Sequence, residues 1–557
     1  MMSYWKVNEP TNQLAPDYQQ KSRKRILIIA LSSIVLVAVV VAAVVATRGG
    51  NNASSGQQDS GSMSTLKAVC AATLYPDTCV SSLSPLVNSN QALSPQDLFK
   101  VFLQVANVEL VKATKYFSRL NGTSSLASAA LDDCREFLGL ALAHLNNTYS
   151  QAGSLFSSQN DFRTWLSSVG TYQQTCIDGL NSVDTNLGTS ASQNLKNSTE
   201  LTSNALAIIS YFSNLLGGGQ VKLRRLMESG DWVSDEDRSL LERKLTQITP
   251  NIIVAQDGTG HYKTIGQAIL AVPQKSSKRT VIYVKKGVYN ENVKISANVW
   301  NLMIYGDGRY ETLVSGRLNF VDGTTTYQSA TFAVLGKNFI ARDIGFVNTA
   351  GAIKQQAVAL LAGGDLTIFY HCAMDAFQDT LYTYTNRQLY RECDIFGTVD
   401  FIFGNSAAVF QKCNIFPRLP LLGQQDTITA QGKFDPNQNT GIAIQNCTIL
   451  PLGNLGATQV YLGRPWKLYS TTVYLENYLG SLINPQGWLP WQGTSGPSTI
   501  FYAEYRNRGP GSSIKRRVNW AGVRSALAPT VASKFTVDSF IQGNLWISAG
   551  IPYTPGL

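Results

Sequence analysis

Side chains that can do acid–base chemistry recur at regular steps between residues 356 and 466. The group consists of two glutamines, two aspartates and a Leu-Gly-Arg-Pro-Trp segment: Gln356, Gln378, Asp379, Asp400, Arg464 and Trp466. Gln356, Asp379 and Asp400 follow one another at two nearly equal steps. Two neighbouring carboxyl groups can divide the work of a nucleophile and of an acid–base catalyst between them. The pattern therefore predicts an enzyme site.

Each member of this group has a chemical use. One of two adjacent carboxyl groups tends to keep its proton, while the other stays ionised when a cation fixes it. The guanidinium of Arg464 can grip a carboxylate through two hydrogen bonds. The carboxamides of Gln356 and Gln378 are neutral donors for a developing oxyanion. Trp466 offers a flat apolar face that suits a sugar ring.

Each residue also has a purely structural interpretation. Aspartates commonly cap turns through their own backbone, glutamines can form polar ladders inside a solenoid, and a tryptophan can pack in a core. Any one residue taken alone favours the structural interpretation. The joint spacing of the aspartates and glutamines, with Arg-Pro-Trp downstream, favours function.

The scarcity of histidine narrows the chemistry. The 557 residues include 3 histidines, no Gly-x-Ser-x-Gly segment and no His-Glu-x-x-His segment. Serine and cysteine hydrolases usually need a histidine base, and many zinc hydrolases need histidine ligands. We therefore expect carboxylates as the reactive groups, without a metal or cofactor.

The chain carries an excess of positive charge. Its 46 Lys and Arg outnumber 36 Asp and Glu, and from residue 246 onward the counts are 26 and 17. A basic surface concentrates a polyanion. No zinc-finger spacing, RNA-binding aromatic motif or Lys/Arg-rich block accompanies the charge, so an acidic polysaccharide is a better candidate than nucleic acid.

The segment 1–65 predicts a membrane helix and a linker. Residues 26–46 are uncharged and mostly apolar, and this run is long enough to span a bilayer as a helix. The basic tail 1–25 should stay cytosolic, giving a type II precursor, and a retained anchor and a cleaved signal both remain open. Residues 47–65 predict a flexible linker. The remainder then enters the secretory route, where five sequons are available for glycosylation: Asn52, Asn121, Asn146, Asn197 and Asn446, the last inside a strand-like run.

Residues 66–216 predict an all-α bundle. Ser94, Pro95 and Asp97 supply a cap, a first-turn proline and a first-turn acid for one of its helices. Four cysteines in an oxidising compartment predict two disulfides: Cys70, Cys79, Cys134 and Cys176. Cys70 and Cys79 form a close pair, but the sequence leaves the three possible pairings open.

Residues 217–247 predict a processing linker between two domains. Three glycines open it, and two dibasic pairs follow, Arg224-Arg225 and Arg243-Lys244. Dibasic pairs are usually solvated surface. Between two domains of a secreted chain, we expect proteolytic cleavage at one of them.

From residue 248 to 557 the pattern becomes all-β, with short apolar runs between Gly, Asn and Asp turns. A short sequence motif, which we call the repeated phrase, begins at residues 342, 372, 393, 413 and 447, at steps of 30, 21, 20 and 34 residues. Periods near 20 with longer inserts are typical of a parallel β-helix. On such a solenoid, Gln356, Asp379 and Asp400 should occupy successive turns of one face.

The cysteines of the repeated phrase invite a second set of predictions. Cys393 and Cys413 fall one turn apart, and neighbouring turns lie roughly 4.8 Å apart. That separation suits a disulfide, which we predict, although two buried thiols in a core ladder are the alternative. We expect Cys372 and Cys447 to be free and buried.

The second half of the chain resembles plant pectin methylesterases. The residues that carry the resemblance run from Val254-Ala-Gln-Asp-Gly258 through Gly287-Val-Tyr289 and the four motifs between 356 and 466 to Gly511 and Trp520, which is most of the β-patterned half. The resemblance implies a right-handed parallel β-helix that hydrolyses methyl esters of homogalacturonan. It implies Asp400 as the nucleophile of an acyl-enzyme mechanism, Asp379 as the proton donor, Gln356 and Gln378 as oxyanion stabilisers and Arg464 as the group that holds Asp400. It also implies sugar contacts: Thr326, Gln356, Arg464, Trp466 and Trp488.

The first half resembles the inhibitor-like pro-region found on many such enzymes. The four cysteines in a helical bundle carry this looser similarity. It implies that the bundle silences the esterase until a subtilisin-like protease of the secretory route cuts the linker, with the second dibasic pair favoured. The mature enzyme would be a monomer in the cell wall.

Two rival functions share part of this pattern. Another pectin-active β-helix enzyme, a lyase or a glycosidase, is one, because glycosidases also use paired carboxylates. The two-Gln, two-Asp and Arg set suits oxyanion stabilisation at an acyl carbon better. A non-catalytic wall-binding protein that uses only charge and aromatic residues is the other.

Overall fold

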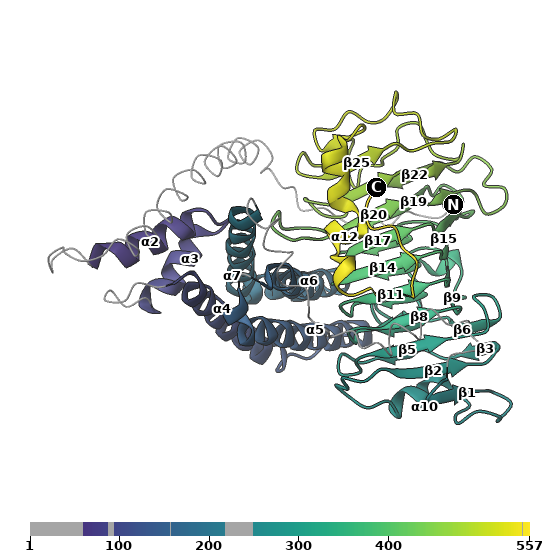
Figure 1. The fold of residues 1–557 in the computed structure, drawn as a ribbon, viewed down its shortest axis with the longest axis horizontal. Coiled ribbons are helices and arrows are strands. Elements are labelled where there is room, and N and C mark those ends of the chain that lie inside the picture. The colour runs from purple at the N-terminus through teal and green to yellow at the C-terminus, as the bar shows by residue number, and fades with distance from the viewer. Residues whose placement is uncertain (1–58, 87–93, 156, 218–248, 548–549) are drawn as a thin grey trace.

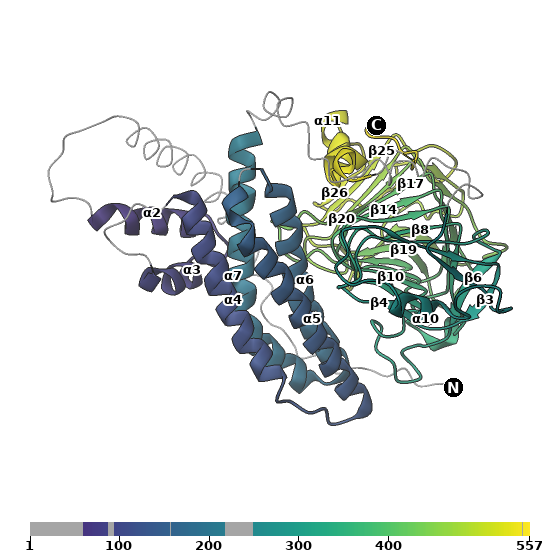
Figure 2. The same ribbon diagram turned by 60° about the horizontal axis from the view of Figure 1, so that its bottom comes forward.

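The computed structural model describes residues 59–86, 94–155, 157–217, 249–547 and 550–557. The expected cytosolic tail, the apolar segment 26–46, Asn52 and both dibasic pairs lie outside these residues. Within the described ranges, no helix is long and apolar enough to cross a membrane. The described chain has two parts, a helical bundle and a β-solenoid, which lie side by side in Figures 1 and 2.

The predicted all-α bundle is present. Its helices are α2 (Asp59–Ala71), α3 (Pro76–Leu83), α4 (Pro95–Phe117), α5 (Ser125–Ser150), α6 (Gln159–Val183) and α7 (Thr185–Gly217). Ser94 caps α4 by accepting a hydrogen bond from the backbone N–H of Asp97, as the sequence predicted. The two expected disulfides join Cys70 to Cys79 and Cys134 to Cys176. The structure thus selects one of the three pairings.

The predicted parallel β-helix is also present, as three sheets whose strands all pair in parallel. The first sheet holds β1 (Ile252–Val254), β2 (Thr280–Val284), β5 (Leu302–Tyr305), β8 (Ile340–Arg342), β11 (Thr367–Tyr370), β14 (Arg387–Arg391), β17 (Ala407–Gln411), β20 (Gly441–Gln445), β23 (Thr471–Leu475), β25 (Phe501–Tyr505) and β26 (Val523–Arg524). The second holds β4 (Val293–Ile295), β7 (Phe332–Val334), β10 (Leu360–Ala362), β13 (Leu381–Thr383), β16 (Ile402–Gly404), β19 (Asp426–Gln431) and β22 (Val460–Gly463). The third holds β3 (Gly287–Asn290), β6 (Thr312–Gly316), β9 (Gly345–Asn348), β12 (Ala373–Asp375), β15 (Asp394–Gly397), β18 (Asn414–Pro417), β21 (Thr448–Ile449) and β24 (Tyr478–Leu479).

Short helices cover the N-terminal end and one outer face of the solenoid. Helix α10 (Ile265–Leu270) packs at the N-terminal end, and α11 (Pro529–Ala532) and α12 (Val537–Phe540) lie near the C-terminus. Val537 and Ile541 pack on the outer face of the first sheet. The interior between the sheets is a continuous column of buried aliphatic and aromatic side chains. This burial on both faces explains the near-continuous apolar runs in the sequence.

The repeated phrase marks one corner of the solenoid. The first sheet turns into the third through a single residue with a left-handed φ of 48° to 57°, on seven turns: Asp343, His371, Glu392, Lys412, Asn446, Glu476 and Arg506. The next residue points into the core, as Ile344 and Cys372 do. Asn446 is therefore exposed at a corner rather than inside a strand.

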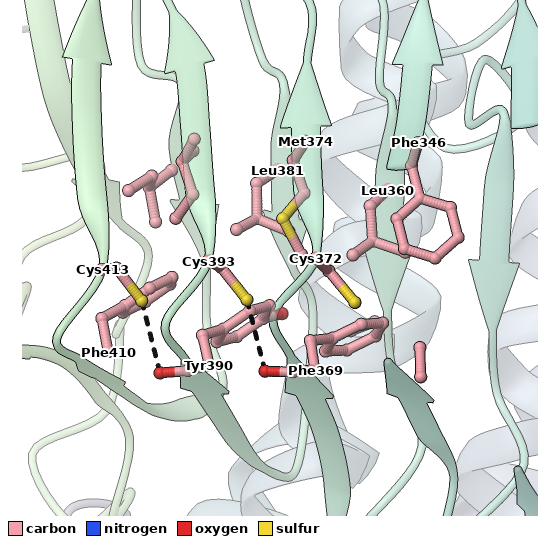
Figure 3. Close-up of a cluster of buried hydrophobic side chains, with 14 of the residues drawn as sticks. Phe346, Leu360, Phe369, Cys372, Met374, Leu381, Tyr390, Cys393, Phe410 and Cys413 are labelled. Carbon is pink, nitrogen blue, oxygen red and sulfur yellow. Dashed lines mark hydrogen bonds between the residues drawn. The ribbon is translucent and has the colours of Figure 1, made fainter. Parts of the chain in front are cut away.

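The predicted disulfide between Cys393 and Cys413 is wrong. Both thiols are free and buried, as are Cys372 and Cys447, which were expected to be so. Figure 3 shows the thiols of Cys372, Cys393 and Cys413 stacked on successive turns. Cys393 Sγ donates to the Phe369 carbonyl at 3.3 Å, and Cys413 Sγ donates to the Tyr390 carbonyl at 3.4 Å. In-register parallel strands hold their Cα–Cβ bonds parallel, so each sulfur follows its own strand instead of turning toward the next.

Thiol counting checks this arrangement. A thiol reagent added to the native chain should find none of the four free cysteines, because all are buried. In denaturant without reductant it should find four, and after reduction it should find all eight. A count of two thiols in the unreduced, denatured chain would instead show that Cys393 and Cys413 form a disulfide.

The bundle packs against the second sheet. The outward-facing residues of five neighbouring strands form one ladder that shares a core with the helices: Ala333, Leu361, Tyr382, Phe403 and Ala430. Phe137 of α5 contacts Tyr327 and Tyr384 at ring separations of 4.6 and 5.7 Å. The docked bundle therefore covers the outer face of this sheet.

Candidate active site

Asp379 and Asp400 occupy the same position on successive turns. Each lies just before a strand of the second sheet, and Leu381 of β13 pairs directly with Ile402 of β16. Both aspartates have a left-handed φ, 64° and 53°, which short polar side chains tolerate better than branched ones. The step between them is thus one turn, and the two carboxyl groups are neighbours as predicted.

The Asp400 carboxylate is held by two residues. Arg464, which follows β22, donates from Nε to Oδ1 at 2.8 Å and from Nη2 to Oδ2 at 2.7 Å. Thr427 Oγ1 donates to Oδ1 at 2.6 Å and accepts from the Asp400 backbone N–H at 2.9 Å. A bidentate guanidinium and a hydroxyl donor together fix the position of this carboxylate. Asp400 is therefore held in one orientation.

Asp379 has the opposite electrostatic environment. Burial raises the pKa of its carboxyl well above the usual value, the Asp400 charge raises it further, and Arg464 opposes both. A carboxyl of raised pKa beside an arginine-held carboxyl group is an arrangement that suits acid–base chemistry with a nucleophile. The raised pKa also has a consequence for stability.

The stability cost of Asp379 should grow with pH. Because its folded-state pKa lies above the unfolded value, the native chain binds more protons than the unfolded chain, and stability falls as pH rises from about 4 toward the raised pKa. Asp379→Asn removes this dependence. We expect the melting temperature of the variant minus that of the wild type to increase by about 2 °C or more between pH 4 and pH 7. A difference that stays constant or decreases with pH would contradict the raised pKa.

One glutamine lies on the same turn as Asp379, and the other lies on the turn before it. Gln378 precedes Asp379 directly, is half-buried, and its carbonyl accepts from the Ala357 N–H at 3.3 Å. The register aligns Asp379 with Val358, so Gln356 lies two positions before the ladder position of the aspartates and aligns with Phe377. Gln356 Oε1 is buried without a hydrogen-bond partner among the described residues. The expected alignment of Gln356 with the aspartates is therefore shifted along the strand direction, on the same side of the solenoid.

Of the two tryptophans expected to contact sugar, Trp466 lies at the site and Trp488 does not. Trp466 is half-buried, 6.3 Å from the Phe403 ring and 6.5 Å from the Trp491 ring, and Arg464 lies 4.4 Å from the Trp491 ring. Trp488 is 1% exposed and packs inside the solenoid against Tyr474 and Tyr502, so the prediction that it contacts sugar is wrong.

Sequence reasoning missed Thr427 and Trp491. Trp491 was detectable as the second tryptophan of the segment Trp488-Leu-Pro-Trp491, and it is the exposed one. No regular spacing marked Thr427, because the turn from Asp400 to Thr427 is longer than the turn that precedes it. Thr326 lies in the loop before β7, and the adjacent Thr325 donates to Asp133 of α5.

Helix α6 runs along the ends of the second-sheet strands. Ser168 Oγ donates to Asn386 Oδ1 at 2.8 Å after β13, and Asn405 Nδ2 donates to Thr171 Oγ1 at 2.8 Å after β16. Further along, Lys467 pairs with Asp178. Trp466 packs at the edge of the shared core. The helix thus spans the turns that carry the two aspartates.

A parallel β-helix that carries an arginine-held aspartate beside a buried aspartate of raised pKa is an arrangement that a hydrolase can use. The description "Pectinesterase" fits residues 251–544, and "Plant invertase/pectin methylesterase inhibitor" fits residues 64–208. The chain belongs to the pectinesterase family, whose members are carboxylic ester hydrolases, and it carries an inhibitor-like domain at its N-terminal side.

Relatives match nearly the whole chain. It is 51% identical to "Probable pectinesterase/pectinesterase inhibitor 46" of Arabidopsis thaliana, over 87% of each chain. It is 48% identical to "Pectinesterase 3" of Phaseolus vulgaris, over 98% of this chain and 97% of that one. Among solved structures, "Pectin methylesterase from Carrot" is 47% identical with a TM-score of 0.55, and 56% of this chain covers 100% of that one.

Proposed function

We propose that this chain hydrolyses the methyl esters of homogalacturonan, giving de-esterified pectin and methanol. The observation that carries the proposal is the pairing of Asp400, held through two hydrogen bonds by Arg464, with a neighbouring Asp379 of raised pKa. Family membership and the similarity to the carrot pectin methylesterase support the substrate class.

The first half-reaction transfers the acyl group to the protein. The Asp400 carboxylate attacks the ester carbonyl carbon, and the carbonyl oxygen becomes an oxyanion that the amides of Gln356 and Gln378 stabilise. The bond to the methoxy oxygen breaks, and the Asp379 proton passes to that oxygen to release methanol. The product is a mixed anhydride between Asp400 and the galacturonate.

The second half-reaction hydrolyses the anhydride and regenerates the free enzyme. Asp379, now ionised, takes a proton from water, and the water oxygen attacks the anhydride at the galacturonate carbonyl. Collapse of the second oxyanion releases the galacturonate carboxyl group and the Asp400 carboxylate, which Arg464 receives. Thr326, Gln356, Arg464 and Trp466 would contact the sugar chain. The steps use side chains alone, without a metal or cofactor.

We also propose how the activity is controlled. The bundle covers the outer face of the second sheet and keeps the esterase silent until cleavage at Arg224-Arg225 or Arg243-Lys244 by a subtilisin-like protease. The tail would be residues 1–25 and the anchor 26–46. The linker, expected over 47–65, would end at 58, because helix α2 already begins at Asp59, and the pro-region would then extend to 216. The processing segment would be 217–247 and the esterase 248–557. The precursor would follow the secretory route as a type II protein, and the mature monomer would act in the cell wall.

Methanol release from methylated pectin tests the reaction class. We expect the folded chain, cut in the 217–247 segment and freed of the bundle, to release methanol without shortening the polymer. Chain cleavage would indicate a glycosidase, and an unsaturated product would indicate a lyase. Pectin binding without methanol release, chain cleavage or an unsaturated product would indicate a non-catalytic wall-binding protein.

A further inference from the structure

One ion pair between the bundle and the solenoid lies next to the candidate sugar platform. Lys467 Nζ contacts both carboxylate oxygens of Asp178 on α6, Oδ1 at 2.8 Å and Oδ2 at 2.7 Å. The same ammonium lies 5.5 Å from the centre of the Trp466 ring. Lys467 closely follows Arg464 in the chain, so it belongs to the segment that holds the nucleophile.

The partner of Lys467 is supplied entirely by the bundle. Asp178 is the only carboxylate that pairs with Lys467 among the residues that the structure describes. Once the bundle leaves, the ammonium remains next to Trp466 without a counter-charge from the solenoid. An ammonium beside an aromatic platform can receive a carboxylate carried by a sugar unit.

Two other basic residues of the solenoid pair with acids of the bundle, and both differ from Lys467. Arg387 pairs with Asp161 of α6, but it also pairs with Asp365 of the solenoid at 2.7 Å, so release of the bundle leaves it neutralised. Lys294 pairs with Glu136, but it lies on β4, four strands from β16 in the second sheet. Of these three, Lys467 alone combines a lost counter-charge with a place beside Trp466 and Arg464.

We propose that Lys467 binds the free carboxylate of a de-esterified galacturonate unit near the methyl ester under attack, and that Asp178 occupies this site in the uncut chain. The inference rests on the proposed function and names which substrate that site prefers. An ester near existing free carboxylates would bind better than one in a fully methylated stretch.

The ratio of rates on two substrates tests this inference. The substrates are a fully methylated oligogalacturonide and one of equal length with about half of its carboxyls free, at low salt. The full chain is folded, cut within 217–247 and separated from the bundle, since the carrot enzyme is a solved chain that corresponds to the solenoid half alone. Lys467→Gln removes the charge. Lys534→Gln, an exposed lysine in the 3-10 turn Ser533–Phe535 near the C-terminus, is the matched control.

We expect wild type and Lys534→Gln to have a higher kcat/KM on the half-esterified substrate. In Lys467→Gln the ratio of the two kcat/KM values should fall about two- to fivefold, the range for a partly exposed ion pair, through a higher KM. Lys467→Arg should retain the preference, and added salt should weaken it. An unchanged ratio, or equal losses on both substrates, would overturn the inference. Absence of methanol from wild type on both substrates would instead refute the proposed function.

Discussion

Replacing Asp400 with asparagine should lower the rate of methanol release by at least about 10⁴-fold, the usual scale for loss of a nucleophile. The amide cannot form the anhydride, and it cannot take the place of the carboxylate in its charged pair with Arg464. Binding of methylated pectin should persist, because the aromatic and basic groups around the site are unchanged. Initial rates of methanol release and a pectin-binding assay on the same preparation measure both effects.

The control for this variant is Asp257→Asn, an exposed aspartate just after β1 at the N-terminal end of the solenoid, several turns from Asp400. It should keep full activity. Turnover by Asp400→Asn within tenfold of the wild type would exclude Asp400 as the nucleophile. Loss of both binding and the folded state would call for Asp400→Glu as a second variant, which keeps the charge but moves the reacting oxygen and should also be inactive.

The sequence predicted the paired aspartates because the solenoid turn between them has no insertion. The step from Asp379 to Asp400 is one turn, and the zero offset in the strand pairing makes sequence spacing equal to spatial order. Arg464 could be chosen because an arginine is the natural partner of a buried carboxylate. The bidentate contact across two turns was therefore foreseeable from residue type and not from spacing.

Insertions and side-chain direction account for what the sequence did not predict. Thr427 occupies the same ladder position as Asp400 one turn later, but the loop between β18 and β19 lengthens that turn and hides the equivalence. Trp488 and Trp491 have the same residue type and lie close together in the chain, and only the fold shows that the first packs inside. Cys393 and Cys413 have disulfide-like spacing, but their parallel side chains do not converge.

The bundle and the outer face of the second sheet share one hydrophobic cluster, separate from the solenoid interior. No pattern in either half of the sequence predicts this shared cluster. The outward ladder that includes Tyr382 and Phe403 is covered by the bundle, and Trp466, which in our proposal contacts sugar, packs at its edge. Aromatic side chains suit both burial and sugar contact, since they bury large area and also present flat faces. Trp466 therefore connects control of the enzyme to its substrate contacts.

Removing the bundle should raise esterase activity at least about 100-fold over the uncut chain. If activity requires an undocked bundle, a docking preference of only ~2.7 kcal/mol leaves about 1% of the chain active. The measurement is methanol release before cleavage, after cleavage within 217–247, and after separation of the two parts. Cleavage alone should raise activity less than separation, because the interface remains intact. Equal activity at all three stages would refute autoinhibition.

A substitution at the interface of the uncut chain should also raise the esterase activity, without cleavage. Ser168 is buried on α6 against Asn386, so Ser168→Arg places a charged side chain inside the interface and should weaken docking enough to raise activity at least about tenfold. Ser182→Arg introduces the same side chain on the exposed face of the same helix and should leave the uncut chain silent. If both variants stay silent while the separated solenoid is active, another part of the bundle carries the inhibition. If both become active, the arginine acts by unfolding the bundle, and the contact between α6 and the second sheet is not the control point.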